Sequence, residues 1–138
     1  MNELSEYYIS SCKKIVEKIK TELLSKGEYL CQHAQNNGDY KDVTGTLRSS
    51  FAFRMYDNGK IVADHFANNI STDKPQTEDP QMLAVDALEE NSPAGNGISI
   101  VLVAGAKYSK FVEDKGYNVM HLTIEEAKKI IEEIIQSP

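Results

Sequence analysis

Three histidines and several carboxylates are the residues of this chain best suited to metal or acid–base chemistry. A zinc site needs three or four such side chains that converge on one point. No two histidines have the i, i+4 spacing that places both on one helical face, and the sequence lacks a His-Glu-x-x-His or Cys-x-x-Cys pattern. We therefore expect no metal site. The enzymatic alternative, a small metal-dependent hydrolase, would have to use His33, His65 and His121 with Asp64, Glu113 or Asp114.

The nearest approach to a nucleophile with its base is Cys31 followed by His33. Side chains two residues apart on a helix diverge, so a buried, apolar cysteine explains this pair better. Ser49 and Ser50 have no suitable partner nearby, and Gly95-Asn96-Gly97 is too short for a phosphate-binding loop. The sequence thus predicts a protein without catalytic residues or cofactors.

Charge and composition narrow the class of protein further. The chain has 138 residues, with 15 Lys and Arg against 21 Asp and Glu, a formal charge of −6. This balance argues against a protein that binds nucleic acid by neutralising phosphates. No apolar run approaches the roughly 20 residues of a membrane-spanning helix, and the first residues lack the pattern of a leader peptide. We expect one domain, residues 1–138, made in a cytoplasm with reduced cysteines.

A long amphipathic helix is predicted at the start of the chain. Apolar side chains recur there every three, four or seven residues, the period of one helical face. The stripe consists of Leu4, Tyr8, Cys12, Ile15, Ile19, Leu23, Leu30 and Ala34. Because the stripe keeps its phase across Gly27, we expect one helix over residues 1–37, on the order of 50 Å long. Such a rod is expected to project from the domain or to pack on a neighbouring subunit.

The middle of the chain has the period of two that is typical of strands. Residues 51–56 and 60–66 flank Asn58-Gly59, a dipeptide that favours the positive φ angles of a type I′ hairpin turn. Residues 97–104 are nearly all apolar and often β-branched, which predicts a central strand. Residues 67–96 are a predicted insertion, a loop followed by a short helix that begins at Asp79-Pro80. The side chains expected on one side of this short helix are Met82, Leu83, Val85 and Leu88.

The end of the chain predicts one more long helix. Thr123 and Glu126 have the spacing of a capping box, in which each side chain bonds to backbone near the other. The apolar stripe of this helix is expected to be Ile124, Ala127, Ile131 and Ile134 or Ile135. With a short helix before it, the order of elements predicts an α+β fold: a long N-terminal helix, a small antiparallel sheet of hairpin plus central strand, a short helix and a C-terminal helix.

The segment Thr44-Gly45-Thr46-Leu47-Arg48-Ser49-Ser50 connects the first helix to the hairpin. Thr44 can cap a short helical turn over residues 45–49, with Leu47 in the core and Arg48 pointing outward. The same residues also suit a plain connector between a helix and a strand.

A second segment, residues 104–117, follows the apolar strand. Gly105 ends that strand, and residues 107–115 are predicted to form the short helix, which Gly116 stops. Glu113 lies on a neighbouring face of this helix. The side chains expected to face inward are Tyr108, Phe111 and Val112. Tyr108 and Val112 are equally explained as core residues and as partner contacts.

Taken together, the two segments resemble the tail-completion or head-tail joining family of long-tailed bacteriophages and prophages. The Thr-Gly-x-Leu-Arg-x-Ser element of that family precedes a β-hairpin and is matched here by Thr44, Gly45, Leu47, Arg48 and Ser50. The later Ala-Gly-x-x-Tyr-(Ala/Ser)-x-x-Val-Glu-x-x-Gly element is matched by Ala104, Gly105, Tyr108, Ser109, Val112, Glu113 and Gly116. The resemblance spans most of the chain. It departs from the family at residues 67–96 and at Asp114-Lys115, where many relatives have an aromatic residue and glycine.

The resemblance implies a non-enzymatic virion protein without a cofactor, and without membrane or specific nucleic-acid binding. Such a protein would form a ring, hexameric to match tail symmetry, at the virion head-tail junction between the connector and the tail-tube protein. A closed ring needs two different complementary patches on each subunit, and we expect them on the long helix and on residues 67–96. We also expect an ion pair between Arg48 and Glu113, within the fold or across subunits.

A second interpretation of the same sequence is a small helical interaction module, such as an antitoxin-like adaptor. The long amphipathic helix would then pair with a partner protein along a coiled-coil seam. Assembly state separates the two interpretations, because a ring favours the virion role and a stable one-to-one complex favours the adaptor.

Overall fold

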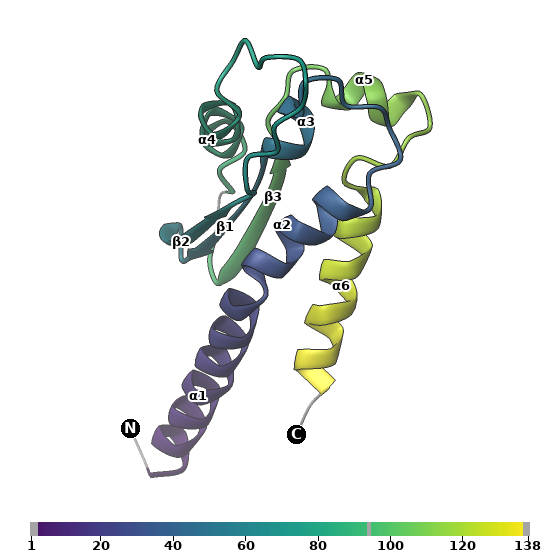
Figure 1. The fold of residues 1–138 in the computed structure, drawn as a ribbon. Coiled ribbons are helices and arrows are strands. Elements are labelled where there is room, and N and C mark those ends of the chain that lie inside the picture. Colours follow the sequence, from purple (N-terminus) through teal and green to yellow (C-terminus); the bar gives the residue numbers. More distant parts are fainter. Residues whose placement is uncertain (1–2, 94, 137–138) are drawn as a thin grey trace.

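The computed structural model describes residues 3–93 and 95–136, with backbone alone for residues 3–5 and 7–12. Its centre is a three-stranded antiparallel sheet in the order β2-β1-β3, covered by helices on both faces (Figure 1). The strands are β1 (Phe51–Asp57), β2 (Lys60–Phe66) and β3 (Ile98–Ala104). The chain therefore has the predicted α+β fold.

The hairpin forms where the sequence predicts it. β1 pairs with β2 around a two-residue turn in which Asn58 has φ 50° and Gly59 has φ 81°, the positive angles of a type I′ turn. The prediction that residues 97–104 form the central strand is wrong, because β1 is central and β3 lies at the edge. β3 is apolar on both faces because helices pack against both sides of the sheet, and a central place in the sheet is not needed to explain its composition.

The first helix is bent rather than continuous. It divides at Lys26 into α1 (Glu3–Ser25) and α2 (Gly27–Asn36), and α1 extends away from the sheet (Figure 1). Gly27 is buried against the sheet, where an added Cβ would lie 2.9 Å from the Phe53 ring and closer still to the His65 ring. The glycine thus lets α2 approach β1 and β2, and the expected straight rod is wrong. Three positions of the predicted stripe, Leu4, Tyr8 and Cys12, lie outside the described side chains.

The larger part of the core lies between the sheet and the helices α1, α2 and α6 (His121–Gln136). Its buried members are Leu23, Leu30, Cys31, Phe53, Met55, Ala127, Ile130 and Ile134. Cys31 is a free thiol, and burial, with the Glu28 carboxylate as a smaller cause, raises its pKa to about 12. Exposure rises along the stripe of α1 from 4% at Leu23 to 58% at Ile15, because the helix leaves the core.

The opposite face of the sheet is covered by α4 (Pro80–Glu90). The Asp79 carboxylate accepts the backbone N–H of Gln81 at 3.0 Å, which confirms the predicted start of this helix. Ala84 and Leu88 pack against β1 and β3, whereas Met82, expected on the same side, is 56% exposed. Residues 67–96 thus supply one layer of the fold.

The chain ends with α5 (Ser109–Asp114) and α6. The predicted capping box is wrong, because α6 begins at His121 and Thr123 lies inside it, fully buried. The Thr123 hydroxyl bonds instead to His33 Nδ1 of α2 at 2.9 Å. Of the predicted stripe, Ala127 and Ile134 are buried, but Ile124 is 40% exposed.

Candidate functional site

The first motif segment folds into α3 (Thr46–Ser49), the short helical turn that its sequence predicts. Gly45 precedes it with φ 77°, and a Cβ there would collide with the carbonyl oxygen of Ile70. Leu47 is buried at 1% exposure, as predicted. Thr44 Oγ1 accepts the N–H of Thr46 at 3.3 Å, and Asp42 Oδ2 accepts the N–H of Arg48 at 2.8 Å. The prediction that Thr44 caps this turn is wrong, because Gly45 is the N-cap residue and Asp42 is the stronger acceptor for the first N–H groups.

Arg48 does not point outward as predicted. Its guanidinium donates to the backbone carbonyls of Gly38 at 2.7 Å and Tyr40 at 3.3 Å, and it lies over the Tyr40 ring at 4.5 Å from the centroid. Arg48 and Glu113 form no ion pair with each other in the described part of the chain, so the predicted pair within the fold is wrong. The role of Arg48 within the chain is to hold the connection after α2.

Ser50 joins the two motif segments. Its fully buried hydroxyl donates to the Leu47 carbonyl at 2.8 Å and accepts the N–H of Ala106 at 3.0 Å. Its carbonyl accepts the N–H of Gly105 at 2.9 Å. We call these four residues, Leu47, Ser50, Gly105 and Ala106, the joint. Segments more than 50 residues apart in the sequence therefore meet there by direct hydrogen bonds.

Close packing explains the glycine of the joint. A Cβ on Gly105 would lie 2.5 Å from backbone atoms of both Leu83 and Ala84 in α4. Those atoms belong to a helix backbone and cannot move aside independently. Gly105 thus brings the end of β3 against α4, which the sequence alone does not reveal.

Glu113 of the second segment caps the start of α6. Its carboxylate accepts the backbone N–H groups of Val119, Met120 at 3.2 Å and His121 at 3.1 Å. These donors precede the first intrahelical bonds and would otherwise lack acceptors. Gly116 lies in the chain between Glu113 and these donors and has φ 95°. An added Cβ there would meet no other atom, so a glycine is favoured at this position by its backbone conformation and not by its small size.

The other predicted inward residues of this segment differ in exposure. Val112 packs against the cluster around Leu47 and Phe51. Tyr108 is 43% exposed and Phe111 is 63% exposed, so the prediction that both face inward is wrong. None of the residues of α5 is fully buried, and Val112 is its partly buried contact with the core.

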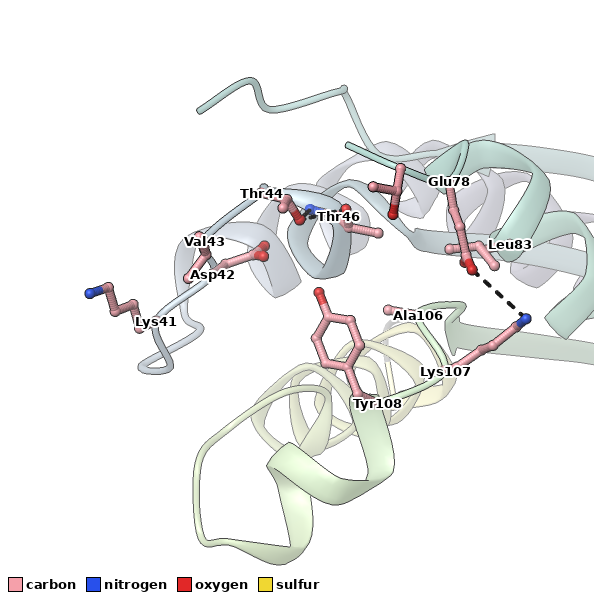
Figure 2. Close-up of a pocket in the computed structure, with 11 residues that line it drawn as sticks. Lys41, Asp42, Val43, Thr44, Thr46, Glu78, Leu83, Ala106, Lys107 and Tyr108 are labelled. Carbon is pink, nitrogen blue, oxygen red and sulfur yellow. Dashed lines mark hydrogen bonds and ion pairs between the residues drawn. The ribbon is translucent and has the colours of Figure 1, made fainter. Parts of the chain in front are cut away.

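Both motif segments line one open groove with a volume of about 460 Å³ (Figure 2). The segments contribute Thr44, Thr46, Ala106, Lys107 and Tyr108, and the rest of the lining consists of Lys41, Asp42, Val43, Thr77, Glu78 and Leu83. Figure 2 shows the Tyr108 hydroxyl directed toward Thr44 and Thr46. This groove is the candidate functional site.

The groove is lined by both polar and apolar side chains and carries both signs of charge. Lys107 Nζ lies 3.9 Å from Glu78 Oε1, an exposed pair of small energetic value. Burial, assisted by the Asp42 carboxylate, raises the pKa of Tyr108 against the opposing effect of the Thr44 hydroxyl, so Tyr108 stays protonated at neutral pH. The groove can therefore hydrogen-bond a side chain of a partner, and no histidine or cysteine is among its described lining residues.

The residues of the enzymatic alternative do not converge on one site, although Glu113 and His121 line the same pocket. His33 bonds to Thr123 between α2 and α6, while His65 packs on Phe53 with 5.7 Å between ring centroids. Within residues 3–93 and 95–136, no group of three or more His, Cys, Asp or Glu side chains is placed to hold a metal ion. The same described part contains no helix both long and apolar enough to cross a membrane.

Sequence reasoning missed two polar residues that organise this region. Gln35 is buried and donates to the carbonyls of Arg48 at 3.0 Å and Asn68 at 2.7 Å, which ties α2 to α3 and to the loop after β2. Asp42 supplies the cap of α3, and its Oδ1 is buried without a hydrogen-bond partner among the described residues. An Asp shortly before a Thr-Gly turn was the available signal for this cap.

Comparison of the chain with protein-family models, with curated proteins and with solved structures gives no match. The class of protein is defined by the fold itself: a small α+β domain with a three-stranded sheet between helical layers. Within it, the two motif segments form a buried joint beside an open groove.

Proposed function

We propose that this chain is a non-enzymatic, ring-forming assembly protein of the head-tail junction in a long-tailed bacteriophage or prophage. The observation that best supports the proposal is the joint at Ser50. The two segments that carry the resemblance fasten to each other through the hydroxyl and the carbonyl of this one residue. A resemblance spread over two distant segments gains weight when those segments form one structural unit.

The distribution of exposed apolar side chains also supports ring formation. Ile15 and Val16, in the middle of α1 where the helix leaves the core, are 58% and 43% exposed, and Met82 on α4 is 56% exposed. α1 and α4 cover opposite faces of the sheet. A closed ring needs two unlike patches on different sides of each subunit, which these two regions can supply.

The test is the assembly state of the full chain, alone and mixed with the connector and tail-tube proteins encoded beside its gene. Negative-stain electron microscopy and native mass spectrometry should show closed rings, with six subunits expected. Ile15→Asp and Met82→Asp should each prevent ring closure. Ile61→Asp, on an exposed position of β2, is the matched control and should leave rings intact. A chain that stays monomeric with both partner proteins present would contradict the proposal.

The exposed end of α1 also favours a second candidate, the adaptor that binds another protein through its long helix. In that case the mixture should yield a stable complex of one copy of this chain with one copy of a neighbouring gene product. Ile15→Asp would then abolish that complex, whereas Met82→Asp would not affect it, so the pair of variants separates the two functions.

A further inference from the structure

The outer edge of β3 has unpaired backbone groups. At the two ends of the β1–β3 ladder, Gly105 donates to the Ser50 carbonyl and Asn58 donates to the Gly97 carbonyl, both at 2.9 Å. Hydrogen-bonded pairs alternate along an antiparallel ladder, so the odd-numbered residues from 97 to 105 bond to β1. The even-numbered residues direct their N–H and C=O groups away from the sheet.

Those outward groups have almost no partners inside the chain. The Ala104 carbonyl accepts the Ser109 hydroxyl at 3.2 Å. The N–H and C=O groups of Ile98, Ile100 and Leu102 have no hydrogen-bond partner anywhere in residues 3–93 and 95–136. Each of these residues is partly exposed. A strand of seven residues thus presents three consecutive donor and acceptor pairs to its surroundings.

The two edges of the sheet differ in how they are protected. β2 carries Lys60, Asp64 and His65, and the extra residue of a β-bulge shifts its register opposite Met55 and Tyr56. Charges and bulges on an edge strand hinder pairing with another strand. β3, with the sequence Ile-Ser-Ile-Val-Leu-Val-Ala, has neither a charge nor a bulge. Its edge is therefore the one suited to pairing.

We propose that β3 pairs with β3 of a second copy of this chain, antiparallel and about a two-fold axis at Ile100. The outward residues 98, 100 and 102 are symmetric about Ile100. Antiparallel pairing places Ile98 opposite Leu102 of the other copy and Ile100 opposite itself, and every outward N–H and C=O of these residues gains a partner. No charged side chains meet, and the two sheets become one of six strands.

This contact is isologous, whereas a cyclic ring uses heterologous contacts. The β3 pair is therefore an additional contact that holds two copies together, and it does not depend on the proposed function. A ring could form through α1 and α4 with or without it, so each can fail while the other stands.

The direct test uses charge at the two-fold axis. Sedimentation velocity should show a concentration-dependent dimer for the unaltered chain. Ile100→Lys and Ile100→Glu each place like charges opposite each other and should raise the dimer dissociation constant by about tenfold or more. An equimolar mixture of the two variants should restore the dimer, because Lys then faces Glu. Ile61→Lys on β2 is the matched control and should leave the constant unchanged.

Hydrogen exchange of the unaltered chain gives a second test that does not depend on a variant folding. The amides of Ile98, Ile100 and Leu102 should exchange more slowly as protein concentration rises. The amides of Asp64 and Phe66, outward on the opposite edge by the same alternation, should not change. A monomer at all concentrations, or variants that do not recover on mixing although both are folded, would overturn the two-fold β3 pair.

Discussion

The joint at Ser50 and the projecting end of α1 differ in what surrounds their side chains. At the joint, Leu47 and Ser50 are buried, and every polar atom of the Ser50 side chain has a partner. On the projecting part of α1, Ile15 is 58% exposed, and Lys13 and Lys14 beside it are exposed. Substitutions at the joint should therefore change folding, whereas substitutions on α1 should change assembly. The residues of the joint are framework, and recognition surfaces are to be sought on α1 and in the groove beside the joint.

The strongest test of this comparison is Leu47→Asp. The change buries a carboxylate in the cluster that contains Phe51 and Val119, and we expect a loss of about 5 kcal/mol or more in the free energy of unfolding. A loss of that size approaches the whole stability of a small domain. Urea unfolding followed by circular dichroism measures it. Val43→Asp, four residues earlier and 53% exposed, should shift the midpoint little. Equal urea midpoints for Leu47→Asp and Val43→Asp would show that Leu47 does not stabilise the fold as a core residue.

Glu113→Ala should have the next largest effect. Three backbone N–H groups at the start of α6 lose their charged acceptor, which should cost about 2–3 kcal/mol. Hydrogen exchange of the amides of residues 119–121 should also be faster in the Glu113→Ala variant. Asp114→Ala, at the neighbouring exposed carboxylate, is the control and should be near neutral. If Glu113→Ala folded with unchanged stability and lost only assembly, Glu113 would belong to an interface.

The buried thiol of Cys31 should make the body of the protein sensitive to alkaline pH. The folded thiol keeps its proton to about pH 12, whereas the unfolded thiol loses it near its ordinary pKa of 9.0. Above pH 9 the unfolded state thus binds fewer protons, and the free energy of unfolding falls by up to about 1.4 kcal/mol per pH unit.

Below pH 9 the thiol is protonated in both states and contributes no pH dependence. In a Cys12→Ser background, the stability advantage of Cys31 over Cys31→Ala should therefore shrink between pH 9 and 10. A constant difference across this range would show that the Cys31 thiol is accessible to water.

The smallest effect on stability is expected at the end of α1. Ile15→Asp replaces an exposed side chain and should change the free energy of unfolding by less than about 0.5 kcal/mol. The same variant should lose ring closure in the electron-microscopy assay. A loss of stability comparable with that of Glu113→Ala would mean that α1 is part of the framework.

Local signals in the sequence predicted the parts of the fold that depend on neighbouring residues. Asn58-Gly59 placed the hairpin, Asp79-Pro80 placed the start of α4, and the period of apolar residues placed Leu23 and Leu30 in the core. Each of these features is decided within a few residues, by turn geometry, capping or helical periodicity.

Features that depend on distant contacts were beyond these signals. Gly27 bends the first helix because the Phe53 and His65 rings lie beneath it, and the edge position of β3 depends on which strands pair. Thr123 and Glu126 have the spacing of a capping box. In the folded chain, however, the turn before α6 brings the Glu113 carboxylate to the N–H groups of Met120 and His121, so Glu113 caps the helix. The candidate groove was equally hidden, since it exists only where the two motif segments meet.

The ion pair of Arg54 with Asp64 shows the same limit at the scale of one residue. If the two strands paired residue by residue from the Asn58-Gly59 turn, without a bulge, Ala63 would lie opposite Arg54. The β-bulge shifts β2 by one residue and brings the Asp64 carboxylate to 2.7 Å from Arg54 Nε. This bond holds the guanidinium pKa above its ordinary value, on a residue that is 7% exposed.

Because the first helix bends at Lys26, a small change in the angle between α1 and α2 would move the far end of α1 by a large distance. α1 has 23 residues, so its first turn lies about 35 Å from the bend. A change of about 10° in the angle between α1 and α2 would move that end by about 6 Å, with the sheet, the joint and the groove left as they are. Subunits that differ only at this angle could therefore fit rings or partners of different diameter.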